Sequence, residues 1–277
     1  TTRSVRRHPV TMRTKAIAVL VGLVVLEACA KVPITGRRQL SLVNEGEMMA
    51  MANTEYSGFL KENQAMPQSD ANVVRVRTIG NKLAQAATTY LNDNNAVNRV
   101  DGFEWEFNVV NDPTVNAWCM PGGKVVVYTG ILPVAATDAG LAVVMGHEIA
   151  HAIARHGSER MSQGIALQGA GMTLEVLAQQ NPSTAGNLFL QSFGIGSELG
   201  MLAYSRKHES EADKMGLVFM AMAGYDPRNA PQFWKRMAEQ GGGQKPPEIL
   251  STHPSDERRI ADLEAYMPEA MKYYKPQ

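Results

Sequence analysis

The chain has 277 residues, with 27 basic and 27 acidic side chains and a formal net charge of zero. Hydrophobic residues make up 44% of it and charged residues 19%, which is typical of a soluble globular protein with one or two domains and a substantial core. A neutral chain lacks the basic surface that nucleic-acid binding requires, so we expect no nucleic-acid partner.

The first thirty residues differ in composition from the rest. Arg13 and Lys15 precede an apolar run over 16–26 that only Gly22 interrupts. A helix over this run is about 16 Å long, too short for a bilayer core of about 30 Å. A basic start followed by a short apolar run is typical of a secretion signal, so we expect a signal peptide over 1–28.

Cys29 follows small residues at the end of this leader and resembles the lipid-acceptor cysteine of bacterial lipoproteins. Glu27 departs from that pattern, in which a small or apolar residue is usual. A soluble secreted protein cut near Ala28 and a short N-terminal anchor are the alternatives. We expect lipidation at Cys29, then a tether over 29–43 and one domain over 44–277.

The elements of this domain follow from periodicity and turn residues. Apolar residues at helical spacing predict two helices early in the domain, and alternation predicts two strands after them. Further helices follow, the first of which ends with Gly157 as its C-cap. The expected helices span 44–61, 70–91, 138–155, 199–223, 227–240 and a segment from 254 on, and the expected strands span 103–107 and 124–128. The predicted fold class is α+β and predominantly helical, with a small sheet beside the helix that carries His147.

The run His-Glu-Ile-Ala-His over 147–151 predicts a metal site. Residues four apart on a helix share a face, so His147 and His151 can present two imidazoles to one Zn²⁺. Glu148 lies beside the first ligand, where it can act as general base toward a water. Chance occurrence of this motif is on the order of 0.01 per chain of this composition. The alternative, two surface histidines and a salt-bridging glutamate, fits poorly because the helix is apolar nearly all round and buried unpaired histidines are costly.

A catalytic zinc needs a third protein ligand. His156 is one candidate, but the metzincin spacing requires Gly at 154 and His at 157, where this chain has Ala154 and Gly157. Glu209 and Asp213 form the better candidate pair, because they are four residues apart and share a helix face. Glu209 can ligate zinc while Asp213 accepts the N–H of a ligand histidine. The alternative for this acidic run is a solvated helix face.

The H-E-x-x-H motif and the later S-R-x-x-E-x-x-A-D run, over 205–213, resemble the gluzincin zinc metallopeptidase family of the CAAX prenyl endopeptidases and HtpX. With the lipoprotein-type leader and the segment over 116–123, the chain is most similar to the soluble periplasmic lipoprotein branch, the BepA and LoiP type. The resemblance covers about 44–265. It implies a zincin-like domain with one Zn²⁺ per chain, Glu209 rather than Glu211 as third ligand, and Asp213 and Arg206 as residues that support the ligands.

The resemblance also implies how a substrate binds. The segment over 123–130 resembles the edge strand beside the active helix, to which an extended peptide can add by main-chain hydrogen bonds. Asn116, Gly123, Val125 and Val127 are therefore candidate substrate-binding residues. The alternative is an ordinary core strand.

A His-Pro segment near the C-terminus is similar to one that this family carries near the zinc. His253 lies in it, with Arg258 five residues on. His253 could act in catalysis by stabilising the oxyanion, or could occupy the fourth zinc position and hold the enzyme closed. A surface histidine near a helix start is the alternative. The segment over 162–200 is interpreted as a helical lid or substrate-side insertion, and Cys119 as a buried thiol.

These observations favour a lipid-anchored zinc endopeptidase of the bacterial cell envelope, periplasmic and at the outer membrane. The resemblance implies polypeptide substrates, namely unfolded or misassembled envelope proteins. An outer-membrane assembly factor or chaperone with a structural or self-blocked zinc site is the second hypothesis. Glu148 favours the enzyme, since a structural site has no need of a general base. A helical lipoprotein without metal is the third.

Overall fold

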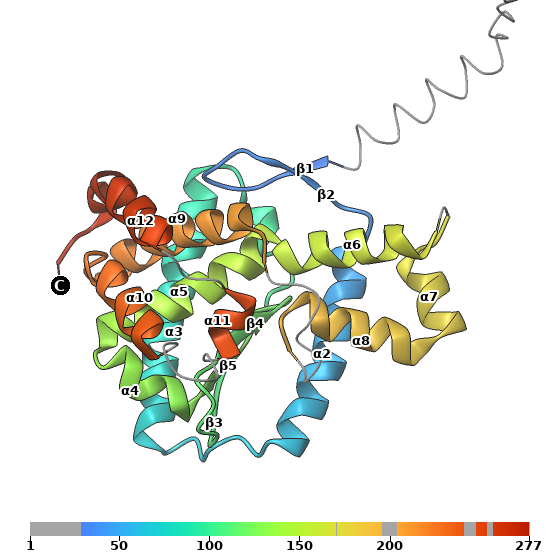
Figure 1. Ribbon diagram of the computed structural model, residues 1–277, viewed down its shortest axis with the longest axis horizontal. Helices are drawn as coiled ribbons and strands as arrows, with labels where there is room; N and C mark the ends of the chain where they lie inside the picture. Colours follow the sequence, from blue (N-terminus) through green and yellow to red (C-terminus); the bar gives the residue numbers. More distant parts are fainter. Residues whose placement is uncertain (1–28, 170, 196–203, 241–247, 254–256, 277) are drawn as a thin grey trace, which may run out of the picture.

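A computed structural model describes residues 29–169, 171–195, 204–240, 248–253 and 257–276 (Figure 1). The expected signal peptide over 1–28 lies outside the described residues. Helices dominate and a small sheet lies among them, which confirms the expected α+β class. The helices are α2 (Glu45–Glu62), α3 (Ala71–Asp93), α4 (Leu132–Ala135), α5 (Asp138–Ala154), α6 (His156–Gln168), α7 (Leu174–Gln180), α8 (Pro182–Ser192), α9 (Arg206–Met222), α10 (Asn229–Gln240), α11 (Glu248–Thr252) and α12 (Glu257–Ala270). The strands are β1 (Cys29–Lys31), β2 (Arg38–Leu40), β3 (Glu106–Val110), β4 (Ala117–Met120) and β5 (Lys124–Tyr128).

The domain sheet has the strand order β3-β5-β4 within the described residues. Strand β5 is parallel to β3 and antiparallel to β4. Its residues are buried throughout, as expected for a strand with neighbours on both sides. The prediction that 123–130 forms an edge strand is therefore wrong, and the described edge on the side of α5 is β4.

The two faces of this sheet pack on different helices. Alternate residues such as Val125 and Val127 join the core cluster that includes α3 and α5. Trp118 and Val126 lie in a second cluster with residues of α2 and α8. Because side chains alternate across a strand, the two faces of this short sheet contribute to two different hydrophobic clusters, and α5 packs on the face that carries Val125 and Val127.

The helix that carries the H-E-x-x-H motif ends one residue earlier than expected. Arg155 takes the left-handed conformation at φ 58°, and α6 begins at the next residue. The prediction of Gly157 as C-cap is wrong, because this glycine lies inside α6. A Cβ on Gly157 would lie 2.0 Å from the ring of Phe193, so the glycine is required by packing against α8. His156, expected at a helix end, instead starts α6.

The segment expected to be a tether packs against the domain. Strands β1 and β2 pair antiparallel to form a hairpin over 29–40, the N-terminal hairpin. Val32 and Gln39 are buried in its interface with the domain, and the Nε2 of Gln39 donates to the carbonyl of Ala154 at 2.9 Å.

The insertion between the ligand helices is helical, as expected, in its described part. Helix α8 packs against α6, α7 and α2 (Figure 1). Helix α9 begins with Ser205 as its N-cap, whose hydroxyl accepts from the N–H of His208 at 3.2 Å. Residues 199–203 of the helix predicted over 199–223 lie outside the described residues. Across the ranges given above, we find no helix with the length and hydropathy needed to cross a bilayer.

Candidate metal centre

Helices α5 and α9 approach one another at two glycines. A Cβ on Gly216 would lie 3.1 Å from the carbonyl carbon of Gly146 and 3.1 Å from the amide nitrogen of His147. Contacts this short leave no room for a side chain between the helices. The backbones therefore nearly touch, and side chains beside the crossing face one another across a short gap.

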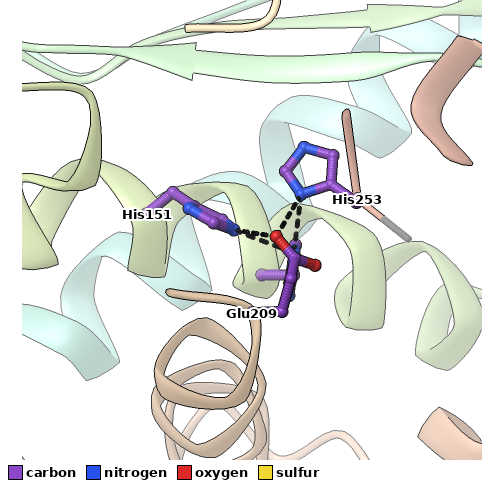
Figure 2. A group of neighbouring side chains, drawn as sticks. His151, Glu209 and His253 are labelled. Carbon is purple, nitrogen blue, oxygen red and sulfur yellow. Dashed lines mark hydrogen bonds and ion pairs between the residues drawn. The ribbon is translucent and has the colours of Figure 1, made fainter. Parts of the chain in front are cut away.

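Four buried side chains meet in that gap: those of His147, His151, Glu209 and His253. One potential ligand atom from each lies within 4.8 Å of all the others. Figure 2 shows His151 and His253 pointing toward the Glu209 carboxylate, from α5 and from the end of the α11 segment. The Nε2 atoms of His147 and His151 are 3.0 Å apart, and His253 Nδ1 is 3.0 Å from Glu209 Oε1.

The residues of this group fit a zinc ion. Three imidazoles and one carboxylate are the nitrogen and oxygen ligands that Zn²⁺ takes in tetrahedral sites. Burial lowers the pKa of His151 well below its usual value, which keeps its ring in the neutral form that ligates a metal. Burial opposes the ionisation of Glu209, but the nearby His253 and Arg259 outweigh it and lower its pKa well below the usual range.

His147 is held from behind by a carboxylate. Its Nδ1 lies 2.9 Å from Oδ1 of Asp213, the arrangement expected for Asp213 from the sequence. Arg259 from α12 in turn donates to both oxygens of Asp213, at 2.7 and 2.8 Å. Its Nη1 also lies 3.1 Å from Glu209 Oε2, and its guanidinium stacks 3.3 Å above the ring of Trp234.

The supporting arginine is therefore not the one expected. Arg206 is exposed at the start of α9, whereas the arginine that contacts Glu209 and Asp213 is Arg259, so the structure gives the expected supporting role of Arg206 to another residue. Arg258 is exposed as well, whereas its neighbour Arg259 is buried. Helical spacing could have identified Arg259, because it lies four residues before the buried Leu263 and eleven before the buried Ala270, on the same helix face.

Glu148 lies beside the group with a carboxylate poised for proton transfer. The residue is 3% exposed, and its Oε1 makes no hydrogen bond to any described residue. The nearest ion-pair partner of this oxygen is His253 Nε2 at 3.6 Å. Burial raises the pKa of Glu148 to about 7, where a carboxylate can both take and return a proton near neutral pH.

The predicted substrate-binding residues do not share one surface. Val125 and Val127 pair with strands on both sides, so their backbone groups are not open to a peptide. Gly123 accepts from the Glu106 amide at 3.0 Å and would meet Trp105 if it carried a Cβ, so its backbone is also occupied. The expectation of strand addition at these three residues is wrong.

Asn116 immediately precedes the edge strand β4. Its side-chain oxygen accepts from the Ala117 amide at 2.9 Å, and its carbonyl accepts from Tyr128 at 3.1 Å. The amide of Ile249 in α11 reaches the carbonyl of Val115 at 3.3 Å. The α11 segment that carries His253 is thus joined to the chain just before β4.

Tyr204 is a residue of the site that sequence reasoning missed. Its ring lies 4.1 Å from that of His151 and 5.0 Å from that of His253, between centroids, and it is buried. The only signal for it in the sequence is its place directly before Ser205, where the run over 205–213 begins.

Comparison with known proteins agrees with this geometry. A family model described as Peptidase family M48 matches residues 75–267. The chain is 36% identical over 244 residues to the mitochondrial metalloendopeptidase OMA1 of Schizosaccharomyces pombe, a match covering 86% of this chain and 66% of that protein. Identity to OMA1 of Saccharomyces cerevisiae is 33% over 254 residues, covering 88% and 71%. The beta-barrel assembly-enhancing protease of Escherichia coli is 32% identical over 162 residues, covering 57% of this chain and 33% of that protein.

The side-chain group and these matches define a zinc metallopeptidase with a zincin-like domain. The chain belongs to peptidase family M48. The expected class of metalloendopeptidase and the expected zinc cofactor are thereby confirmed at the level of the family. Relatives of the chain occur both among mitochondrial proteins and in a bacterium, and the bacterial match covers less of it.

Proposed function

We propose that this chain is an endopeptidase in which His147, His151 and Glu209 hold zinc and Glu148 is the general base. The observation that carries the proposal is the buried group of four ligand atoms within 4.8 Å, with the Glu148 carboxylate beside it. When bound, zinc supplies a Lewis acid that polarises a water and the scissile carbonyl. Glu148 takes a proton from the attacking water as the C–O bond forms, and returns it to the leaving amine as the C–N bond breaks.

His253 occupies a place in this arrangement that bears on activity. Its Nδ1 lies 3.2 Å from His147 Nε2 and 3.0 Å from Glu209 Oε1, inside the ligand group and not beside it. This supports the fourth-ligand role over the oxyanion role. The chain is then in a closed state, and His253 must withdraw before a water can reach Glu148.

Substrate addition is proposed at β4 in place of β5. Asn116 forms a hydrogen-bonded pair with Tyr128, so the backbone groups of Ala117 and Cys119 alternate with the bonded pairs and face the edge. Because the Ala117 amide is bound by the side-chain oxygen of Asn116, a substrate would have to displace that side chain to reach it. Withdrawal of the α11 segment from Val115 would open this edge together with the metal group. An extended polypeptide paired there would cross α5 near Glu148.

The leader and one relative support a proposal for the cellular location of the protein. A basic and apolar leader ending at Cys29 supports a lipid anchor, and the E. coli relative is described as beta-barrel assembly-enhancing. We propose a periplasmic protein anchored at the outer membrane that cleaves unfolded or misassembled envelope proteins. Loss of membrane association in Cys29→Ser would support the anchor, and retained association would refute it.

Zinc content and cleavage of casein by the full chain test the chemistry. Glu148→Gln should keep zinc and lose cleavage, whereas Glu209→Gln should weaken zinc binding. His253→Ala should cleave faster than wild type if this histidine closes the site. Slower cleavage in His253→Ala would instead support the oxyanion role.

A client-binding factor with a self-blocked site is the second candidate, favoured by the position of His253 within the ligand group. Stoichiometric zinc without cleavage by wild type or His253→Ala would support it. Cleavage that depends on Glu148 would exclude it as the sole function.

A further inference from the structure

A chain of polar side chains leads from His151 away from the metal group. The Nδ1 of His151 lies 2.9 Å from the Nδ1 of His156, and the Nε2 of His156 lies 3.1 Å from Oε2 of Glu211. All three side chains are buried. Since the Nε2 of His151 points into the ligand group, Nδ1 is the nitrogen left to receive support from outside it.

Glu211, the last of these three side chains, is bound by residues of the N-terminal hairpin. Thr35 Oγ1 donates to Oε1 of Glu211 at 2.6 Å, and Arg37 Nε donates to Oε2 at 2.8 Å. The other two nitrogens of Arg37 bind both oxygens of Glu159 on α6, at 2.9 and 2.7 Å. One guanidinium thus ties the hairpin to carboxylates on both α6 and α9.

A break in the helix brings the two imidazoles together. Residues five apart on a continuous helix point roughly 140° away from each other, so His151 and His156 could not meet on one. The left-handed Arg155 ends α5 between them, at φ 58°. The ring of His156 then lies alongside that of His151, with centroids 4.8 Å apart, and stacks on His208 at 4.5 Å.

The hydrogen bonds that link His151, His156 and Glu211 all point from His151 toward Glu211. Glu211, as a carboxylate, only accepts, so the Nε2 of His156 carries the hydrogen and its Nδ1 is an acceptor in the neutral ring. The Nδ1 of His151 must then donate. The Nε2 of His151 is left without hydrogen, as a metal ligand must be.

We propose that His156 is a positioning residue of the metal centre, which fixes the ring and tautomer of His151, and that Thr35 and Arg37 of the N-terminal hairpin extend this support through Glu211. The inference rests on the proposed zinc site. The two histidines of α5 are then supported differently, His147 by a carboxylate directly and His151 by a carboxylate relayed through a second imidazole. Partners of this kind typically change metal affinity by about 10- to 100-fold.

The test is the zinc dissociation constant of the full chain, measured by competition with a chromophoric chelator at fixed pH. His156→Leu removes the acceptor and should raise the constant by about 10- to 100-fold. His156→Asn loses the same ring but keeps an acceptor oxygen near the place of Nδ1, and should recover most of the affinity. An unchanged constant in His156→Leu overturns the proposal, as does equal weakening in both variants, which would show a packing effect.

The hairpin is tested with a matched pair of arginines. Arg37→Met should weaken zinc binding severalfold, because Glu211 loses a donor. Arg75→Met removes an arginine whose Nε lies 2.6 Å from Asp138 and which belongs to another part of the domain, and should leave zinc binding unchanged. Equal constants for the two variants would refute the part played by the hairpin.

The tautomers give a readout that does not depend on any variant folding. Long-range ¹H–¹⁵N spectra of the zinc-loaded wild type should show hydrogen on Nδ1 of His151 and on Nε2 of His156. Hydrogen on Nδ1 of His156 overturns the relay. If wild type binds no zinc, the proposed function fails together with this inference. Zinc-dependent cleavage with insensitive variants refutes the inference alone.

Discussion

Among the charged side chains at the metal centre, Arg259 should contribute most to the free energy of unfolding. Its guanidinium lies between the carboxylates of Glu209 and Asp213, and all three side chains are less than a tenth exposed. Removing the cation leaves two carboxylates facing each other in a buried place. Loss of one partner from a buried ion pair costs about 3–5 kcal/mol. At about 2–4 °C per kcal/mol for a chain of this size, Arg259→Met should lower the Tm of the metal-free protein by about 6–20 °C.

Zinc should reverse part of this loss. The ion adds positive charge next to Glu209, so saturating zinc should raise the Tm of Arg259→Met by more than that of wild type. The assay is thermal unfolding with chelator and with zinc. Arg228→Met is the control, because Arg228 is 64% exposed and water screens its pair with Asp226. A metal-free Tm for Arg259→Met within about 2 °C of wild type, or equal to that of Arg228→Met, would refute the reasoning.

Two further predictions concern stability away from the ligands. Although burial opposes it, hydrogen bonds from His208 and Arg37 lower the pKa of Glu159 to about 2. Because this is below the unfolded value of about 4.3, the stabilisation is present above that pH and is lost as pH falls toward 2. Urea unfolding of metal-free protein should show Glu159→Gln less stable than wild type at pH 7, by on the order of 2–3 kcal/mol, with the difference shrinking toward pH 3; a constant difference would contradict it. Gly80→Ala should cost about 1–3 kcal/mol, because its Cβ would lie 2.4 Å from the ring of the buried Phe107. Gly58→Ala in α2, with nothing within 4 Å of its Cβ, should stabilise by up to about 1 kcal/mol, and similar effects of the two would show that the close contact is irrelevant.

The sequence was most informative where chemistry and helical period coincide. The spacings of His147 with His151, and of Glu209 with Asp213, place each pair on one helix face, and the structure brings the two faces together. The start of the helix predicted over 70–91 is also explained by residue type, since Asp70 is a favourable N-cap and its side chain accepts from the amide of Asn72. Each of these inferences depends on residues within one helical turn of one another.

Inferences that need strand neighbours or unusual dihedrals were less successful. Strand order is set by tertiary pairing, and the motif over 123–130 was taken for an edge although the uninterrupted apolar run of β5 is typical of a central strand. The C-cap was assigned to Gly157 because glycine is the usual left-handed residue, whereas Arg155 takes that conformation. The strand expected over 103–107 begins only at Glu106, although the amide of Glu104 already donates to the carbonyl of Gly122 at 2.9 Å. The aromatic alternation before Glu106 therefore accompanies ring packing and one backbone hydrogen bond, but not a regular strand.

The backbone contact at Gly146 and Gly216 has a consequence for how metal binding is organised. Helices separated by side chains can adjust their spacing by changing rotamers. Here a Cβ on Gly216 would lie only 3.1 Å from the backbone of Gly146, so no side chain separates the two helices and their spacing is set once the domain folds. The donors of α5 and α9 are thus preorganised, and their conformational entropy is lost during folding instead of during ion capture. Association of zinc with this centre should accordingly be governed by access past His253 and not by rearrangement of the helices.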